Sequence, residues 1–93
     1  MNFYSQKYWK DISEQIIIQE KVCFICGDNE NLIVHHKKFK IDGGTEEREN
    51  LVVLCNLCHT KLHTLERFYR NNHVRKSFDR LALELRRRRN AIA

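Results

Sequence analysis

The four cysteines of the 93-residue chain occur as two pairs, and both pairs have the spacing of a metal-binding turn. Cys23 and Cys26 form the first pair, and Cys55 and Cys58 form the second, with 28 residues between the pairs. A C-x-x-C turn can direct two sulfurs at one ion, and two such turns supply the four thiolates of a tetrahedral zinc site. Two disulfides and four reduced core thiols are the alternatives, and a reducing compartment disfavours the disulfides. We therefore interpret the four cysteines as a structural zinc site.

Four of the five histidines lie within or directly beside this cysteine framework. His59 and His63 are four residues apart on a segment with helical spacing, so their side chains project from one face and can bind one ion. Cys58 is rotated by about 100° from His59 on the same helix, so thiolates and imidazoles can occupy different sides of it. This arrangement predicts two metal sites, one closed by four cysteines and one that is open to water and substrate.

His35 and His36 are adjacent at the end of a short β-type run. Neighbouring side chains of a regular strand point to opposite faces, so both imidazoles can reach one site only near a strand end or an irregularity. The loop that follows predicts such an end, where one imidazole could bind metal while the other acts as a base on water. The ordinary pKa of imidazole, near 6.5, suits a base at neutral pH. Two surface histidines without a role are the alternative.

Two short strands and a loop are predicted around these residues. The β-type runs at 32–34 and 51–54 precede His35-His36 and Cys55. The polar segment 37–50 contains Gly43-Gly44 and is predicted to be the loop between the strands. Gly27 directly follows the first cysteine pair, where we expect it to adopt the left-handed backbone conformation of a tight turn.

Three segments have apolar residues at helical spacing. The first, about 5–19, is expected to pack on the zinc module through Trp9, Ile12 and Ile16. The second runs from about 56 to a break at Asn71-Asn72, and the third covers about 74–89. The apolar stripes of these two helices comprise Leu57, Leu62, Leu65 and Phe68 or Tyr69 in one, and Val74, Phe78, Leu81 and Leu85 in the other.

Length and composition limit the class of protein. Ninety-three residues suit one domain, and a core of this size needs a staple, which a structural zinc would supply. No apolar run exceeds the five residues of Leu51 to Cys55, which is far shorter than the ~20 residues of a membrane-spanning helix. The first ten residues contain no apolar segment followed by a small-residue cleavage site. We expect a cytoplasmic protein rather than a membrane or exported one.

The net charge of +5 is distributed unevenly along the chain. Residues 1–66 carry 8 basic and 10 acidic side chains, whereas residues 67–93 carry 9 basic and 2 acidic ones. The phosphates of nucleic acids attract such basic clusters because condensed counterions are released on binding. The C-terminal segment therefore favours a nucleic-acid partner, with a solvated helix face as the alternative.

Taken in order, these motifs resemble the HNH endonuclease family, also called ββα-metal nucleases. Its three motif positions match His36, Asn50 and His59, and the resemblance covers about residues 8–65. It implies a small α+β fold, in which a ββα-metal (His-Me finger) core with a four-cysteine zinc knuckle is flanked by an N-terminal and a C-terminal helix. We expect residues 1–93 to form a single domain, with the motif core at about 21–66 and a basic helix at about 74–90.

The resemblance implies a role for each matching residue. His36 is implied to be the general base, while His35, His59 and His63 are implied to bind the catalytic ion. Asn50 is implied to hold the loop between the strands. His35 stands where relatives often have Asp, and Lys37 follows His36 where relatives often have a proline nearby. Three imidazole ligands lean toward zinc or nickel, so the expected cofactors are a structural Zn²⁺ and one catalytic Mg²⁺, Mn²⁺, Ni²⁺ or Zn²⁺.

The implied activity is metal-dependent hydrolysis of DNA phosphodiester bonds, with double-stranded DNA as the expected partner. A non-catalytic zinc-knuckle DNA-binding module is the alternative, and RNA or structured DNA is another possible substrate class. A homodimer through the last helix, or a larger partner that supplies specificity, is also open. Basic side chains expected to contact the phosphate backbone are Lys37, Lys38, Lys40, Arg75, Lys76, Arg80, Arg86, Arg87, Arg88 and Arg89.

Overall fold

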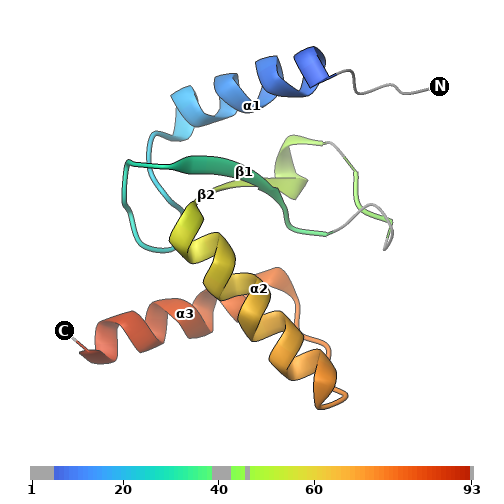
Figure 1. The fold of residues 1–93 in the computed structure, drawn as a ribbon, viewed down its shortest axis with the longest axis vertical. Coiled ribbons are helices and arrows are strands. Elements are labelled where there is room, and N and C mark those ends of the chain that lie inside the picture. The colour runs from blue at the N-terminus through green and yellow to red at the C-terminus, as the bar shows by residue number, and fades with distance from the viewer. Residues whose placement is uncertain (1–5, 39–42, 46, 93) are drawn as a thin grey trace.

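The fold is a two-stranded sheet with one helix on one face and two helices on the other (Figure 1). The computed structural model describes residues 6–38, 43–45 and 47–92. No helix in these ranges has the length and apolar composition needed to cross a membrane. This is the predicted small α+β fold, and its elements are α1 (Gln6–Glu20), β1 (Leu32–His36), the 3-10 turn η2 (Arg48–Asn50), β2 (Leu51–Cys55), α2 (Asn56–Asn71) and α3 (Phe78–Ile92).

The two strands pair in antiparallel register and extend slightly beyond their predicted ends. Leu32 lies opposite Cys55, and His36 lies opposite Leu51. All five residues of β2 are buried, because apolar side chains cover both faces of the sheet. His36 therefore still belongs to the regular strand, which decides the direction of its side chain.

Helix α1 packs on the sheet face formed by alternate strand residues. Its buried Ile16 contacts a cluster with Leu51 and Val53, and Trp9 and Ile12 pack against the same cluster. The sequence predicted that this helix packs on the zinc module, and it packs on the two strands of that module, on the face away from the cysteines. The cysteines belong to the second cluster, together with Val52 and Leu54, whose side chains point to the opposite face.

Helices α2 and α3 cover that opposite face. The buried residues of α2 are Cys58, Leu62 and Leu65. Of the two alternatives at the end of the predicted stripe, Tyr69 packs against the core, whereas Phe68 is 58% exposed, and Leu57 is 64% exposed. The difference follows from helix geometry, because Phe68 and Leu57 are each rotated by about 100° from a residue that faces the core.

The third helix begins at Phe78 instead of at about 74. His73 has a φ of 62°, and the backbone N–H of Val74 donates to the carbonyl of Tyr69 at 2.8 Å, so these residues terminate α2. The Ser77 hydroxyl then accepts the backbone N–H of Arg80 at 3.4 Å, as an N-cap does. Val74 is consequently exposed, whereas Phe78 is buried as predicted.

Candidate functional site

The four cysteine sulfurs converge on one point. All four lie within 4.8 Å of one another, and the sulfurs of Cys26 and Cys55 are 3.6 Å apart. Sulfurs bound tetrahedrally to zinc at 2.3 Å are separated by about 3.8 Å. The cluster therefore has about the dimensions of a four-thiolate metal site, and the four residues suit an ion such as zinc.

Backbone groups hold each thiol pair in place. The N–H groups of Ile25 and Cys26 point at the Cys23 sulfur at 3.4 and 3.5 Å, and Gly27 adopts the predicted left-handed conformation with a φ of 78°. Cys55 is the N-cap of α2, and its sulfur accepts the backbone N–H of Cys58 at 3.4 Å. The second pair is thus built into the junction between β2 and α2.

Burial and backbone donors act on the thiols in opposite directions. Burial raises the pKa of Cys23, but the N–H groups around its sulfur outweigh burial and lower that pKa to about 7. Burial raises the pKa of both Cys26 and Cys58. Buried thiols of this kind ionise when a cation binds among them, which couples metal binding to proton release.

A second cluster consists of three imidazoles on the face covered by α2. His35 of β1 and His59 and His63 of α2 bring one nitrogen each within 4.8 Å of the others. The Nε2 atoms of His59 and His63 are 2.9 Å apart, as the four-residue spacing on a helix predicts. Nitrogens sharing one zinc ion are about 3.3 Å apart, so a small side-chain adjustment would let the three imidazoles bind a divalent metal.

The environment favours the neutral form of two of these imidazoles, His35 and His59. Burial, followed by the charges of the neighbouring histidines, lowers the pKa of His35 to about 4. Burial and then His63 lower the pKa of His59 as well. Neutral imidazole is the form that binds metals, so the cluster is ready for an ion at neutral pH.

His36 points away from this cluster. Its ring stacks on the indole of Trp9 in α1, with 5.1 Å between the ring centroids and 18° between the ring planes. The sequence suggested that a strand end would let both adjacent histidines reach one side. The strand remains regular through His36, which pairs with Leu51, so the two imidazoles lie on opposite faces of the sheet.

Asn50 fastens the chain directly after His36. Its amide Nδ2 donates to the carbonyls of Lys38 and Thr45 at 3.0 and 2.7 Å, and its Oδ1 accepts the backbone N–H of Lys38 at 2.9 Å. The Asn50 carbonyl also accepts the backbone N–H of Lys37 at 2.8 Å. The side chain uses both donor hydrogens and its acceptor on backbone groups, and so it closes the base of the loop.

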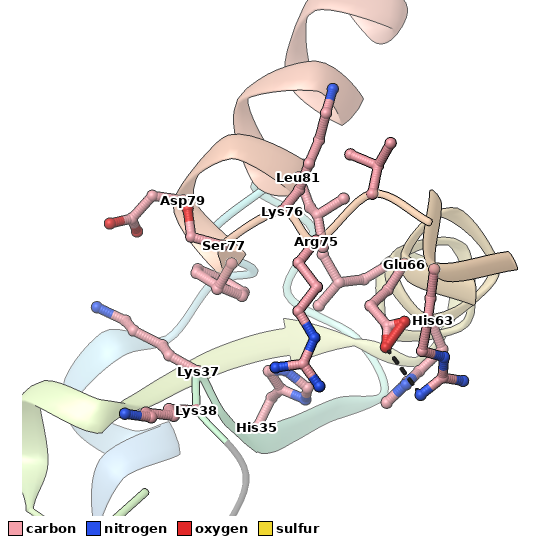
Figure 2. A pocket seen from close by; sticks show the side chains of 14 residues that line it. His35, Lys37, Lys38, His63, Glu66, Arg75, Lys76, Ser77, Asp79 and Leu81 are labelled. Atoms are coloured by element: carbon pink, nitrogen blue, oxygen red, sulfur yellow. Dashed lines mark ion pairs between the residues drawn. The ribbon is translucent and has the colours of Figure 1, made fainter. Parts of the chain in front are cut away.

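A cavity of about 640 Å³ opens beside the imidazole cluster. His35 and His63 line it, together with Phe78, whose ring centroid is 5.7 Å from that of His35. The sequence assigned Phe78 to the core, with a dimer interface as the alternative, because nothing local indicates that α3 reaches β1. Figure 2 shows the Arg75 side chain extending from the α2–α3 connection toward His35. The basic residues of the lining are Lys37, Lys38, Arg70, Arg75 and Lys76.

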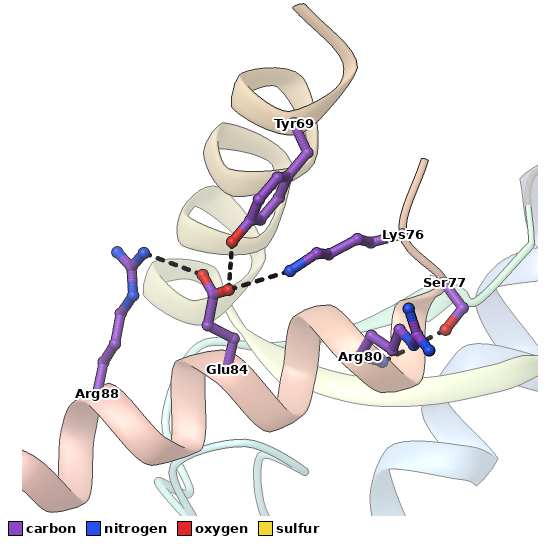
Figure 3. Close-up of polar contacts among 6 residues, drawn as sticks. All are labelled: Tyr69, Lys76, Ser77, Arg80, Glu84 and Arg88. Atoms are coloured by element: carbon purple, nitrogen blue, oxygen red, sulfur yellow. Dashed lines mark hydrogen bonds and ion pairs between the residues drawn. The ribbon is translucent and has the colours of Figure 1, made fainter. Parts of the chain in front are cut away.

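A polar network joins the two helices beside this cavity (Figure 3). The carboxylate of Glu84 accepts the Tyr69 hydroxyl and lies 3.5 Å from the Lys76 ammonium and 2.9 Å from the Arg88 guanidinium. The hydrogen bond from Tyr69 is the largest influence lowering the pKa of Glu84. Lys76 also sits over the Tyr69 ring at 3.9 Å, so it connects α3 with α2 and fixes the connection that carries Arg75.

The remaining basic residues are distributed along α3. The Arg86 guanidinium lies 4.2 Å from the centroid of the Phe24 ring and donates to the Phe24 carbonyl, which ties the helix to the first cysteine turn. Arg80 and Arg87 are exposed. Lys40 and the side chain of Arg89, which the sequence also assigned to DNA contact, lie outside the described residues.

Comparison with protein families agrees with this geometry. Residues 23–65 match the family model described as HNH endonuclease, and this range contains both metal-type clusters and Asn50. Searches of curated proteins and of solved structures return no match. Trp9, Arg75 and α3 lie outside the matched range. Residues 23–65 of this chain are therefore similar to the HNH endonuclease domain.

Proposed function

We propose that this protein is a metal-dependent endonuclease that hydrolyses the phosphodiester bonds of DNA. The observation that supports this most strongly is the cluster of three imidazoles at the wall of a basic cavity. A DNA-binding module stabilised by zinc needs only the four cysteines. The second cluster, which leaves coordination positions for water and substrate, is what an enzyme requires.

The side chains that would hold the catalytic ion are His35, His59 and His63. A divalent cation bound there would neutralise the negative charge that builds up on the phosphate and on the leaving oxygen. Three nitrogen ligands favour zinc or nickel over magnesium, which prefers oxygen. Cleavage should therefore be tested with several metals, including manganese and magnesium.

We assign the role of general base to His36. In-line displacement needs the attacking water and the leaving oxygen on opposite sides of the phosphorus. A phosphate at the end of β1 would have the imidazole cluster on one side and His36 on the other, because adjacent strand residues face opposite ways. Asn50 supports this arrangement, since its hydrogen bonds fix the backbone that follows His36.

The charge of the cavity supports a phosphate ligand. Five basic side chains line it against two acidic ones, Glu66 and Asp79, and Glu66 is already paired with Arg70 at 3.3 Å. Arg75 would share the region of His35 with a metal cation (Figure 2). Two cationic groups converge favourably when an anion lies between them, which assigns Arg75 to the substrate phosphate.

Plasmid cleavage tests this proposal. Supercoiled plasmid is incubated with the protein and a panel of divalent ions, with EDTA as the metal-free control. Cleavage should require metal, and His36→Asn should lower the rate by about 10²–10⁴-fold, the usual contribution of a general base. His73→Asn is the matched control, because His73 is exposed and has a positive φ that asparagine tolerates. Equal rates for the two variants would contradict the assignment of His36.

A non-catalytic DNA-binding module is the second candidate. It is favoured by the position of His36, which stacks on Trp9 on the far face from the three imidazoles. This candidate predicts retention of DNA in a gel shift together with an absence of cleavage under every metal condition. Metal-dependent cleavage by the unmodified protein excludes it.

A further inference from the structure

We infer that Trp9 is a positioning residue for the general base, so that the N-terminal helix is a working part of the nuclease site. The inference rests on the proposed role of His36. Trp9 lies fourteen residues before the segment that matches the family, so the family match assigns it nothing. Its assignment follows from the stacked geometry of its ring on the imidazole of His36.

The two rings form an offset parallel stack. Their centroids are 5.1 Å apart and their planes differ by 18°, which lies within the range of favourable aromatic pairs. Trp9 is itself half-buried and packs against the cluster of Ile16, Leu51 and Val53. The indole is therefore a fixed surface, anchored to the same sheet that carries His36.

The stack controls a degree of freedom that the backbone does not. Pairing with Leu51 and the hydrogen bonds of Asn50 fix the main chain on both sides of His36, but they leave the side-chain torsions to be decided by packing. An aromatic pair favours one ring orientation by roughly twofold to tenfold. Trp9 thus selects the plane of the imidazole.

Stacking leaves the chemistry of the base available. The indole covers one face of the imidazole, whereas the lone pair that accepts a proton lies in the ring plane and projects from the edge. His36 is half-buried, and its strand leads directly into the loop closed by Asn50. A ring held by its face can present a nitrogen to water at the end of β1, which is the geometry that proton abstraction needs.

The kinetic test compares three variants of α1 with the metal that gives the fastest plasmid cleavage. Trp9→Leu should lower kcat about threefold to tenfold and leave KM unchanged, because the orientation of the base affects the chemical step alone. Trp9→Phe retains a stacking face and should keep most of the activity. Ile17→Ala is the matched control, since Ile17 packs on the same cluster and its loss should leave kcat unchanged. Equal losses for Trp9→Leu and Ile17→Ala would overturn the inference.

A second measurement does not depend on cleavage. The ring current of a stacked indole shifts the imidazole protons of His36 upfield in the proton NMR spectrum, and Trp9→Leu should return them downfield while His73 stays in place. Unshifted His36 protons in the unmodified protein would refute the stack itself. A protein that shows the shift but cleaves no DNA with any metal would refute the proposed function, and with it any positioning role, while a normal kcat in Trp9→Leu refutes only the inference.

Discussion

The buried imidazole of His35 should make the stability of the protein sensitive to acid. Its pKa is lowered to about 4 by burial and by the neighbouring histidines, against 6.5 for ordinary imidazole. Between these two values the unfolded chain binds a proton at this position that the folded chain does not. The stability that depends on neutral His35 is therefore fully present above pH 6.5 and is lost as the pH falls toward 4.

The size of the effect follows from the two pKa values. One pKa unit corresponds to about 1.4 kcal/mol, so the complete loss has an upper limit of about 3 kcal/mol. Because His35 titrates at a lower pH in the folded chain than in the unfolded chain, about 2 kcal/mol of this loss falls between pH 7 and pH 5. Domains have total stabilities of roughly 5–15 kcal/mol, so such a change is readily measured.

Urea unfolding at pH 7, 6 and 5 isolates this contribution when the protein carries one zinc ion per chain. The comparison is with His35→Leu, which keeps the four cysteines, so the acid sensitivity of the thiolate site cancels in the difference. Between pH 7 and pH 5, the free energy of unfolding should fall by about 2 kcal/mol more in the unmodified protein than in His35→Leu. His73→Asn should follow the unmodified protein, because its site is exposed. Parallel pH profiles for the unmodified protein and His35→Leu would refute the reasoning.

Two further predictions concern the surroundings of the imidazole cluster. Asn50→Ala removes three hydrogen bonds to backbone groups and should lower the free energy of unfolding by about 1–3 kcal/mol in urea, whereas Asn29→Ala at an exposed position should cost less than about 0.5 kcal/mol. Arg75→Gln should weaken binding of duplex DNA, measured without added divalent ions, severalfold and should reduce the salt slope by about 1. Both effects should be larger than those of Arg87→Gln, because Arg75 lines the cavity and Arg87 does not. Identical binding by the two arginine variants would remove Arg75 from the site.

Local features of the sequence were sufficient to predict the metal-type clusters. The spacing within each C-x-x-C turn, and between two histidines four residues apart, depends only on the local backbone geometry. The structure brings the ligand atoms of these residues together as expected. The strands and α2 were also predictable, because alternation and helical spacing are local patterns. The cysteine pairs, the histidine pair, the strands and α2 could therefore be predicted without knowing how the elements pack.

Several of the differences between prediction and structure concern contacts between distant elements. The sequence shows that Trp9 belongs to an amphipathic helix, but the sheet face that this helix covers depends on which strand residues carry the larger apolar surface. The contact of Phe78 with His35 likewise depends on the path of the α2–α3 connection, which Tyr69 and Glu84 set across two helices. Contacts between distant elements are decided by tertiary packing, and the spacing of apolar residues along the sequence does not specify them.

The first turn of α2 links the cysteine cluster to the imidazole cluster. Cys58 and His59 are consecutive, and the rotation of about 100° between them directs the sulfur to the closed site and the imidazole to the open one. Cys55 caps the same helix through its sulfur, so an ion bound by the cysteines fixes where α2 begins. The position of α2 in turn sets the distance from His59 and His63 to His35 on β1. We therefore expect the cysteine cluster to do more than stabilise a small fold, because the start of α2 that it holds helps to bring three imidazoles from two elements to one point.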